Sequence, residues 1–299
     1  MIAKMNKKSI LSQTALNIIF ILIVIFTIAP FLLLVSSSFT DEQILTQYGY
    51  NFLPKKFSLD SYIYLFKSSD KIFRAYGITI FVTVFGTIIS LLVTTLFAYP
   101  LYRKEFPLRK ALSFIVFFTM LFNGGLVPTY LMWTQTFHIK DTIWALIIPG
   151  HIMNAFYVIM IRSYITSNIP DELIEAARID GATEISCLKN IILPLAKPIM
   201  ATMALMIGLS YWNDWVNCLY YVTDQQLFSI QAVLNTIITN IQYLQSNANL
   251  VGDSSVFASL PSVSIRMAIA VVGVVPVLVI YPFFQKYFVK GIVVGGVKG

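Results

Sequence analysis

Six long stretches of this sequence carry almost no charged side chains, and they limit what the chain can fold into more than any other feature. Each is long enough to cross about 30 Å of hydrocarbon as a helix, which takes roughly 20 apolar residues. They run approximately over residues 15–35, 76–99, 111–133, 142–161, 198–219 and 266–287. The pattern predicts an all-α membrane protein with six transmembrane helices.

The scarcity of charge supports the same class. Charged residues make up 12% of the 299 positions and apolar residues 57%, whereas a soluble domain carries about 25% charge. The net charge of +7 does not indicate nucleic acid, because the basic residues are scattered at the ends of the apolar stretches. We therefore expect a multi-pass protein in contact with membrane lipid, and no nucleic-acid partner.

The positions of lysine and arginine predict the orientation, since cytoplasmic loops are enriched in both. With the N-terminus inside, 14 of the 21 basic residues fall in cytoplasmic segments, and the outer segment 220–265 has none. We expect both termini in the cytoplasm, a retained first helix rather than a cleaved signal peptide, and one permease domain over 1–299. Its cytoplasmic parts would be 1–14, 162–197 and 288–299.

The segment 162–197 is the only long loop predicted on the cytoplasmic side, and its sequence indicates two short helices. Pro170 is tolerated at the start of a helix, and the acidic residues after it complement the helix dipole. Gly181 supplies the left-handed residue that ends the first helix. The second helix is expected to run from about Ala182 until Pro194 ends it.

The first of these helices is predicted to have a small apolar face, formed by Leu173, Ala176 and Ala177. Small side chains allow another protein to approach closely, and Glu175 and Asp180 beside them could pair with basic residues of a partner. A loop lying on the membrane surface is a second interpretation. A helix-turn-helix DNA reader is a third, but the loop has five acids against four basic residues, and phosphate binding needs the reverse.

The loop also contains a fixed pattern: Glu-Ala-Ala, then Gly after three residues, then Ile-x-Leu-Pro after nine more. The matching residues are Glu175, Ala176, Ala177, Gly181, Ile191, Leu193 and Pro194. This pattern resembles the EAA loop of binding-protein-dependent ABC importer permeases. The tail is similar to that of the maltose-type second permease of the carbohydrate-uptake subfamily, and residues 122–130 resemble its oligosaccharide and polysaccharide branch.

The resemblance implies a type I importer (MetI-like) permease fold in the bacterial cytoplasmic (inner) membrane. It implies partnership with a second homologous permease, two cytoplasmic ATPase subunits that bind ATP and Mg, and an extracytoplasmic solute-binding protein. The cargo would be a sugar, and more specifically an oligosaccharide. The residues implied in coupling to the ATPase are Glu175, Ala176, Ala177, Asp180, Gly181, Leu193 and Pro194, and those implied at the ATPase interface in the tail are Gly295, Gly296 and Lys298.

The sequence predicts no catalytic residue, no metal site and no cofactor of its own. Gly291 and Gly296 have the separation found in a phosphate-binding loop, but Val297 stands where the required lysine would be. With only two histidines and no HExxH motif, a metal site is not expected. ATP hydrolysis would take place on separate chains.

Polar side chains within the apolar stretches are candidates for a substrate pathway. An aspartate at a helix centre costs roughly 2.5–3.5 kcal/mol, so such groups usually face a cavity or a partner. Asp214 lies between two tryptophans that could stack on sugar rings; alternatively, the tryptophans belong to the interfacial aromatic belt and Asp214 is a cap or an ion-pair partner. The candidate pathway residues are Asn123, Tyr130, Asn154, Trp212, Asn213, Asp214 and Trp215.

Three functional alternatives remain open at this point. An ion-coupled secondary transporter would need charges within the membrane, and Asp214 is the only one available. A membrane scaffold would use the cytoplasmic loop to recruit a soluble partner without transport. The importer machinery could also carry amino acids, peptides or phosphate instead of sugar.

Overall fold

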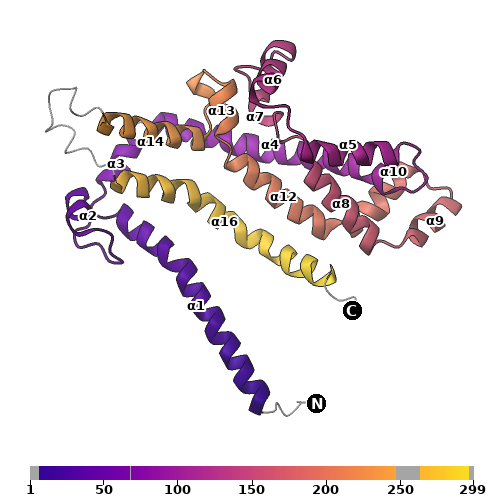
Figure 1. Cartoon of the computed structure of the whole chain (residues 1–299), viewed down its shortest axis with the longest axis horizontal. Helices are drawn as coiled ribbons and strands as arrows, with labels where there is room; N and C mark the ends of the chain where they lie inside the picture. The colour runs from indigo at the N-terminus through magenta and orange to yellow at the C-terminus, as the bar shows by residue number, and fades with distance from the viewer. Residues whose placement is uncertain (1–6, 68, 247–262, 296–299) are drawn as a thin grey trace. The chain divides into compact units, whose positions relative to one another are not determined.

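The regular structure is helical throughout the residues that the computed structural model describes, which are 7–67, 69–246 and 263–295 (Figure 1). Outside the helices, an isolated antiparallel bridge joins Thr40 to Phe57. The predicted all-α class is therefore confirmed for the described part of the chain.

The chain divides into two compact units. The first comprises Met1–Ser69 and Ile237–Val275, and the second comprises Asp70–Thr236 and Pro276–Gly299. Each unit is therefore made of two separate segments of the sequence. The single permease domain over residues 1–299 stays a prediction.

The first unit is built from α1, the short helices after it and the adjoining ends of α14 and α16. Their bounds are Lys7–Ser38 (α1), Glu42–Tyr48 (α2), Asp60–Phe66 (α3), Ile230–Ser246 (α14) and Val263–Gly295 (α16). The Glu42 carboxylate accepts hydrogen bonds from the backbone N–H groups of Val263 and Ser264, at 2.9 and 2.8 Å. A negative charge at this position satisfies the free N–H groups at the start of α16.

The second unit holds most of the buried apolar side chains and contains the predicted cytoplasmic loop. Its helices are α4 (Ser69–Tyr102), α5 (Arg109–Leu121), α6 (Leu126–Leu131), η1 (Met132–Thr136), α7 (Trp144–Ile147), α8 (Ala155–Asn168), α9 (Asp171–Ile179), α10 (Glu184–Cys187), η2 (Leu188–Ile192), α11 (Leu193–Leu195), α12 (Lys197–Trp212), α13 (Val216–Tyr221) and η3 (Gln225–Leu227). Ile161 and Ile165 of α8, Ile174 of α9 and Ile207 of α12 are all buried in one core. This core fixes the loop helices to the bundle.

Three described helices are long and apolar enough to cross a membrane, and the number rises to five if each of two sharply bent helix pairs is one span. The three are Gln13–Ser38, Asp70–Tyr102 and Val263–Phe283. The bent pairs are Arg109–Leu121 with Leu126–Thr136, at 117°, and Glu184–Leu195 with Lys197–Trp212, at 80°. The predicted count of six spans therefore stays a prediction.

Three segments expected to be continuous helices are interrupted, and the expectation was wrong on this point; one of them, 198–219, breaks between α12 and α13. The stretch 111–133 bends where Gly125 adopts a φ of +89°, a conformation that glycine adopts without steric cost. The stretch 142–161 leaves the helical conformation between α7 and α8, where Pro149 and Gly150 (φ +74°) follow each other. Glycine and proline are the residues that most often break a regular helix.

Candidate functional site

The predicted coupling loop has the expected helix–glycine–helix form. Pro170 stands at the N-cap of α9 in an extended conformation, and Asp171 and Glu172 occupy its first turn. Gly181 follows the helix with a φ of +84°, which favours glycine. The Thr183 side chain then accepts a hydrogen bond from the Ser186 backbone N–H and caps α10.

The apolar face predicted for α9 is exposed at two of its three residues. Ile174 is the fully buried residue, and Ala177 packs partly against the same core one turn later. Leu173 is 46% exposed, and Ala176 is exposed as well. The exposure of Leu173 and Ala176 agrees with a face that a partner could approach, whereas Ala177 lies nearer to the buried side of Ile174, which the sequence did not indicate.

The exposed side of α9 combines apolar and acidic side chains. Glu175, Ala176 and Asp180 are exposed with Leu173, and Ile179 is 86% exposed. In the second unit taken alone, this side has nothing packed on it, although its apolar groups would be more stable out of water. Such a surface is suited to contact with a soluble protein.

Pro194 does not end the second helix, which corrects the prediction. Helical structure continues through Glu184–Leu195, and the bend follows at the buried Ala196. A π-turn over Leu188–Ile192 precedes the proline. Pro194 lies in the last turn of this continuous helix, directly after the π-turn, and Leu193 beside it packs partly against the core.

The carboxylate of Asp171, the first residue of α9, is bound by two side chains from the end of α4. The Tyr102 hydroxyl donates to Oδ1, and Nζ of the exposed Lys104 lies 2.7 Å from Oδ2. The Lys104 ammonium and then the Tyr102 hydroxyl hold the pKa of Asp171 below its usual range. This contact was not predicted from the sequence; the available signal was the Tyr-x-x-Tyr-Arg-Lys run over residues 99–104, at the end of an apolar stretch.

The carboxylate of Glu184, the first residue of α10, has a similar set of partners. The Tyr99 hydroxyl donates to Oε2 at 2.5 Å, and Nη2 of Arg178 lies 2.6 Å from Oε1. Nε of the largely buried Arg103 is 3.6 Å from Oε2. Both helices of the loop therefore begin with a carboxylate that a tyrosine of α4 binds.

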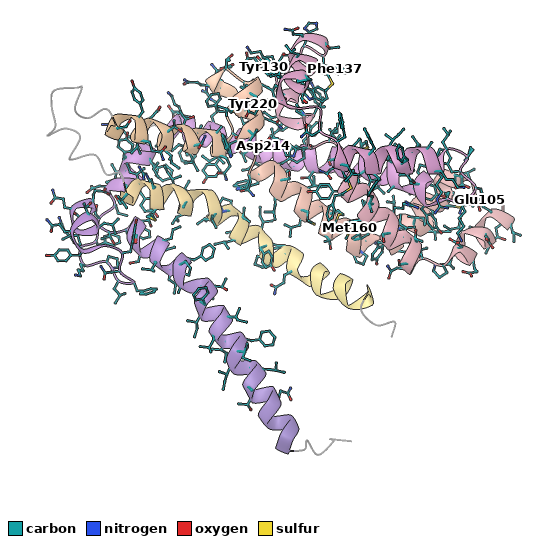
Figure 2. The ribbon with its side chains drawn as sticks, viewed as in Figure 1. Glu105, Tyr130, Phe137, Met160, Asp214 and Tyr220 are labelled. Carbon is teal, nitrogen blue, oxygen red and sulfur yellow. The ribbon has the colours of Figure 1, made fainter. Side chains whose placement is uncertain are left out.

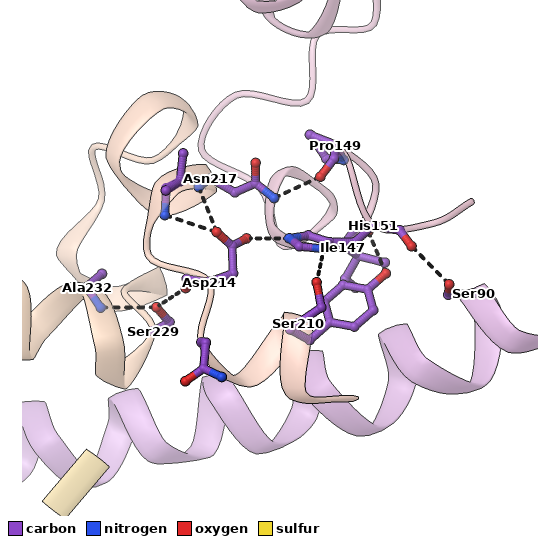
Figure 3. Close-up of polar contacts among 12 residues, drawn as sticks. Ser90, Ile147, Pro149, His151, Ser210, Asp214, Asn217, Ser229 and Ala232 are labelled. Carbon is purple, nitrogen blue, oxygen red and sulfur yellow. Dashed lines mark hydrogen bonds and ion pairs between the residues drawn. The ribbon is translucent and has the colours of Figure 1, made fainter. Parts of the chain in front are cut away.

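Asp214 lies between α12 and α13 and links four segments of the second unit (Figure 3). Its Oδ1 accepts hydrogen bonds from the backbone N–H groups of Val216 and Asn217, at 3.0 and 3.1 Å, and so caps the start of α13. Its Oδ2 is 3.0 Å from Nε2 of His151, whose Nδ1 is 2.9 Å from the Ser210 hydroxyl. The structure thus shows Asp214 as a helix cap and as the partner of His151. The sequence left this arrangement open as the alternative to a role in a substrate pathway.

The same region satisfies the free carbonyl groups of the interrupted segment between α7 and α8. The Tyr211 hydroxyl donates to the Ile147 carbonyl at 2.8 Å, and the Asn217 amide donates to the Pro149 carbonyl at 2.9 Å. The Ser90 hydroxyl donates to the His151 carbonyl at 2.9 Å. Non-helical backbone at membrane depth requires such partners, because lipid offers none.

The other predicted pathway residues make mainly local contacts. The Asn123 side chain accepts from the Gly125 N–H at 2.8 Å, Asn154 caps α8, and the Asn213 amide donates to the Leu209 carbonyl one turn earlier. The ring of Tyr130, labelled in Figure 2, stacks on that of Tyr221 with 6.0 Å between the ring centroids.

The two tryptophans differ in exposure. Trp212 is buried and Trp215 is 39% exposed. Trp212 also lines an apolar cavity of about 280 Å³ with residues of α4, α12 and α16. The seven candidate residues therefore do not form one cluster around Asp214.

Two further predictions concern the tail and metals. Gly295 is the last residue of α16, whereas Gly296 and Lys298 lie outside the described residues. Within residues 7–67, 69–246 and 263–295, no group of three or more His, Cys, Asp or Glu side chains is placed to hold a metal.

Comparison with known proteins identifies a family of transport proteins. A family model described as "Binding-protein-dependent transport system inner membrane component" matches residues 90–294. The chain is 40% identical to Protein LplC of Bacillus subtilis, over 91% of this chain and 90% of that protein. It is 38% identical to the polygalacturonan/rhamnogalacturonan transport system permease protein YtcP of the same organism, over 91% and 93%.

Among solved structures, the chain is similar to a bacterial ABC transporter involved in the import of the acidic polysaccharide alginate. The TM-score is 0.76 at 26% identity, over 95% of this chain and 98% of that chain. These matches confirm the predicted family resemblance, the permease fold and the inner-membrane location. They also identify a transport subunit rather than an enzyme, and they decide against an ion-coupled transporter and a scaffold.

Proposed function

The chain belongs to the family of binding-protein-dependent transport system inner membrane components, and we propose that it is one of two permease halves in an ATP-driven importer of oligosaccharides. A second homologous permease, two cytoplasmic ATPase subunits and an extracytoplasmic solute-binding protein complete the complex. ATP and Mg bind to the ATPase subunits. Six transmembrane helices, with both ends of the chain in the cytoplasm, form one permease domain over residues 1–299.

The coupling part of this proposal rests on the exposed side of α9. Glu175, Ala176 and Asp180 lie there with two exposed apolar residues, on a helix that the buried Ile174 fixes to the bundle. A rigid helix with an outward acidic and apolar surface can fit a cleft of an ATPase subunit and follow its movement. In this proposal, closure of the ATPases moves α9 and opens the pathway to the outside, and hydrolysis resets it.

The cargo part rests on the names of the relatives, which include transporters of polygalacturonan or rhamnogalacturonan and of arabinooligosaccharides. The substrate pathway is proposed to pass the segment around Trp212 and Asp214, with the tail at Gly295, Gly296 and Lys298 near the ATPase interface. Amino acids or peptides are the alternative cargo.

A reconstituted complex tests the cargo. The co-encoded binding protein is supplied with oligogalacturonates, arabino-oligosaccharides, alginate oligosaccharides, raffinose, amino acids or a tripeptide in turn, and ATP hydrolysis is measured. Stimulation by a glycan supports the proposed cargo. Stimulation by amino acids or the tripeptide alone, or by no compound in the panel, overturns it.

The coupling role of α9 is tested by Glu175→Gln, with Glu172→Gln as the matched control. Both carboxylates are exposed on α9, and neither has a hydrogen bond to the rest of the described chain that the change would remove. We expect Glu175→Gln to lower stimulated ATP hydrolysis and import by about fivefold or more, since a hydrogen-bonded charge pair is worth about 1.5–3 kcal/mol. The control variant keeps both activities. Equal activity of the two variants contradicts the assignment of Glu175.

A further inference from the structure

The end of α4 contacts the coupling loop at the start of each of its helices. Tyr99 and Tyr102 lie one turn apart in the last turns of α4, and their hydroxyls donate to Glu184 and Asp171. These acids are the first residues of α10 and α9. Figure 1 shows the two loop helices side by side at one end of the second unit.

The same two carboxylates hold both ends of α9. Asp171 stands at its first position, and Arg178 in its last turn pairs with Glu184 at 2.6 Å. A displacement of α9 along or across its axis therefore stretches a contact with α4 at one end or at the other. This arrangement makes the helix and the end of α4 move together.

The tyrosines provide the stronger part of this attachment. Tyr99 is 7% exposed and Tyr102 4%, so their rings are fixed in the core, and a hydroxyl bound to a carboxylate makes a strong hydrogen bond. Lys104, whose side chain is 71% exposed, contributes less, because ion pairs in water are weak.

The other contacts of α4 lead towards the interrupted segment. Ser90, about two and a half turns before Tyr99, donates to the His151 carbonyl at 2.9 Å. One turn further from the loop, Gly86 lies against the ring of Tyr211, whose hydroxyl binds the Ile147 carbonyl. A continuous helix thus connects the loop contacts with the contacts around Asp214.

We propose that Tyr99 and Tyr102 are positioning residues for ATP coupling: their hydroxyls hold the first residues of α10 and α9, so that movement of the coupling loop is passed to α4. The inference rests on the coupling role proposed above for α9. It assigns to α4 the task of carrying the movement to the segment between α7 and α8.

The test compares Tyr99→Phe, Tyr102→Phe and the double variant with Tyr62→Phe. Each change removes one hydroxyl and keeps the ring, and the hydroxyl of Tyr62 makes a 2.8 Å bond to Ser38, both residues of the first unit, which does not contain the loop. The complete complex is reconstituted with its binding protein and with the glycan of the panel that stimulates the wild type most. Assembly, ATP hydrolysis and glycan import are measured together.

We expect the double variant to assemble normally and to import about tenfold less glycan per ATP hydrolysed, which corresponds to about 1.4 kcal/mol. We expect each single variant to import an amount of glycan per ATP between those of the double variant and the wild type. If the double variant assembles poorly, the single variants decide the outcome. Tyr62→Phe keeps the wild-type ratio. A merely structural role lowers hydrolysis and import in proportion and leaves their ratio unchanged, and that result overturns the inference.

The variants of α9 separate the two proposals. If Glu175→Gln abolishes coupling while the tyrosine variants keep the wild-type ratio, the loop couples to the ATPase and the inference about α4 is wrong. If Glu175→Gln leaves stimulated ATP hydrolysis and import unchanged, the coupling role proposed for α9 is wrong, and the inference about α4 loses the role on which it rests. If Glu175→Gln lowers stimulated hydrolysis and import and the tyrosine variants raise the ATP used per glycan, both proposals hold.

Discussion

The contact between α4 and α12 at Gly86 allows a quantitative prediction. A Cβ atom at this glycine would lie 2.6 Å from Cζ of Tyr211 and 2.8 Å from its Cε1, much closer than carbon atoms can approach. The Tyr211 ring cannot easily move away, because it is only 2% exposed and its hydroxyl binds the Ile147 carbonyl at 2.8 Å. Gly86→Ala must therefore displace the ring, the helix or both.

The expected cost is the balance of three effects. Alanine favours a helix over glycine by about 1 kcal/mol, whereas overpacking a well-packed core costs about 1–3 kcal/mol. Loss of the hydrogen bond from Tyr211 leaves the Ile147 carbonyl unpaired, at about 1–3 kcal/mol. Together these values predict a destabilisation of about 1–5 kcal/mol for Gly86→Ala.

Thermal unfolding of the detergent-solubilised complex measures this effect, and Gly77→Ala is the matched control. Gly77 lies on the same helix, and a Cβ there meets no atom within 4 Å. We expect the midpoint to fall by about 2 °C or more per kcal/mol for Gly86→Ala, and to stay or rise for Gly77→Ala. Addition of Tyr211→Leu to Gly86→Ala should cost less than the sum of the single changes, because the clash is then absent. Equal midpoints for the two alanine variants would refute the argument.

Two further predictions concern the carboxylates of the second unit. Asp214→Ala should lower the thermal midpoint more than Asp214→Asn, because alanine leaves His151 and two N–H groups of α13 unpaired, at about 1–3 kcal/mol each; a changed KM for the cargo at unchanged stability would instead indicate contact with substrate. For Asp171, whose pKa is lowered chiefly by Lys104, the attachment of α9 is present above the ordinary aspartate range and is lost as pH falls through the lowered pKa. Protease sensitivity of the loop should therefore be constant between about pH 8 and pH 5 and rise only below about pH 4, and a rise already near pH 6 would contradict this.

The helical class and the loop were predictable because both depend on short-range patterns. Stretches of roughly 20 apolar residues are evident without any knowledge of tertiary contacts. The helix start at Pro170 and the turn at Gly181 follow from the conformations that proline and glycine adopt. These features need no information from distant parts of the chain.

The interruptions within the apolar stretches were not predictable in the same way. Hydropathy alone cannot distinguish a continuous helix from the broken segment around Pro149 and Gly150. The residues that stabilise the break are distant in sequence and do not change the local hydropathy. Asn217 lies 68 residues from Pro149, and Ser90 lies 61 residues from His151. A break is acceptable in lipid only when such partners exist, so its position is fixed by tertiary structure.

The role of Asp214 also depends on contacts with residues that are distant in sequence. From the sequence, an acid between two tryptophans was as consistent with a sugar site as with a cap. In the structure, both of its oxygens are occupied: Oδ1 by two backbone N–H groups and Oδ2 by His151. An acid with both oxygens engaged has little capacity left to bind a sugar hydroxyl unless the bond to His151 opens.

This arrangement connects the proposals on coupling with the structure of the pathway. Opening of the bond between Asp214 and His151 would leave the Asn217 bond to the Pro149 carbonyl as the remaining hydrogen bond, in the described part of the chain, between α13 and the segment between α7 and α8, and Ser90 binds the same segment from α4. A movement of α4 that follows the coupling loop therefore acts on the segment that Asp214 holds. Between Pro149 and Asn154 the backbone keeps only two long turn bonds, from the His151 and Ile152 N–H groups to the Ile148 carbonyl at 3.5 and 3.4 Å, so it can shift at lower cost than a continuous helix. On the proposed coupling route, the broken segment, rather than a rigid helix, is the part of the second unit where a change imposed at α9 would alter the proposed pathway.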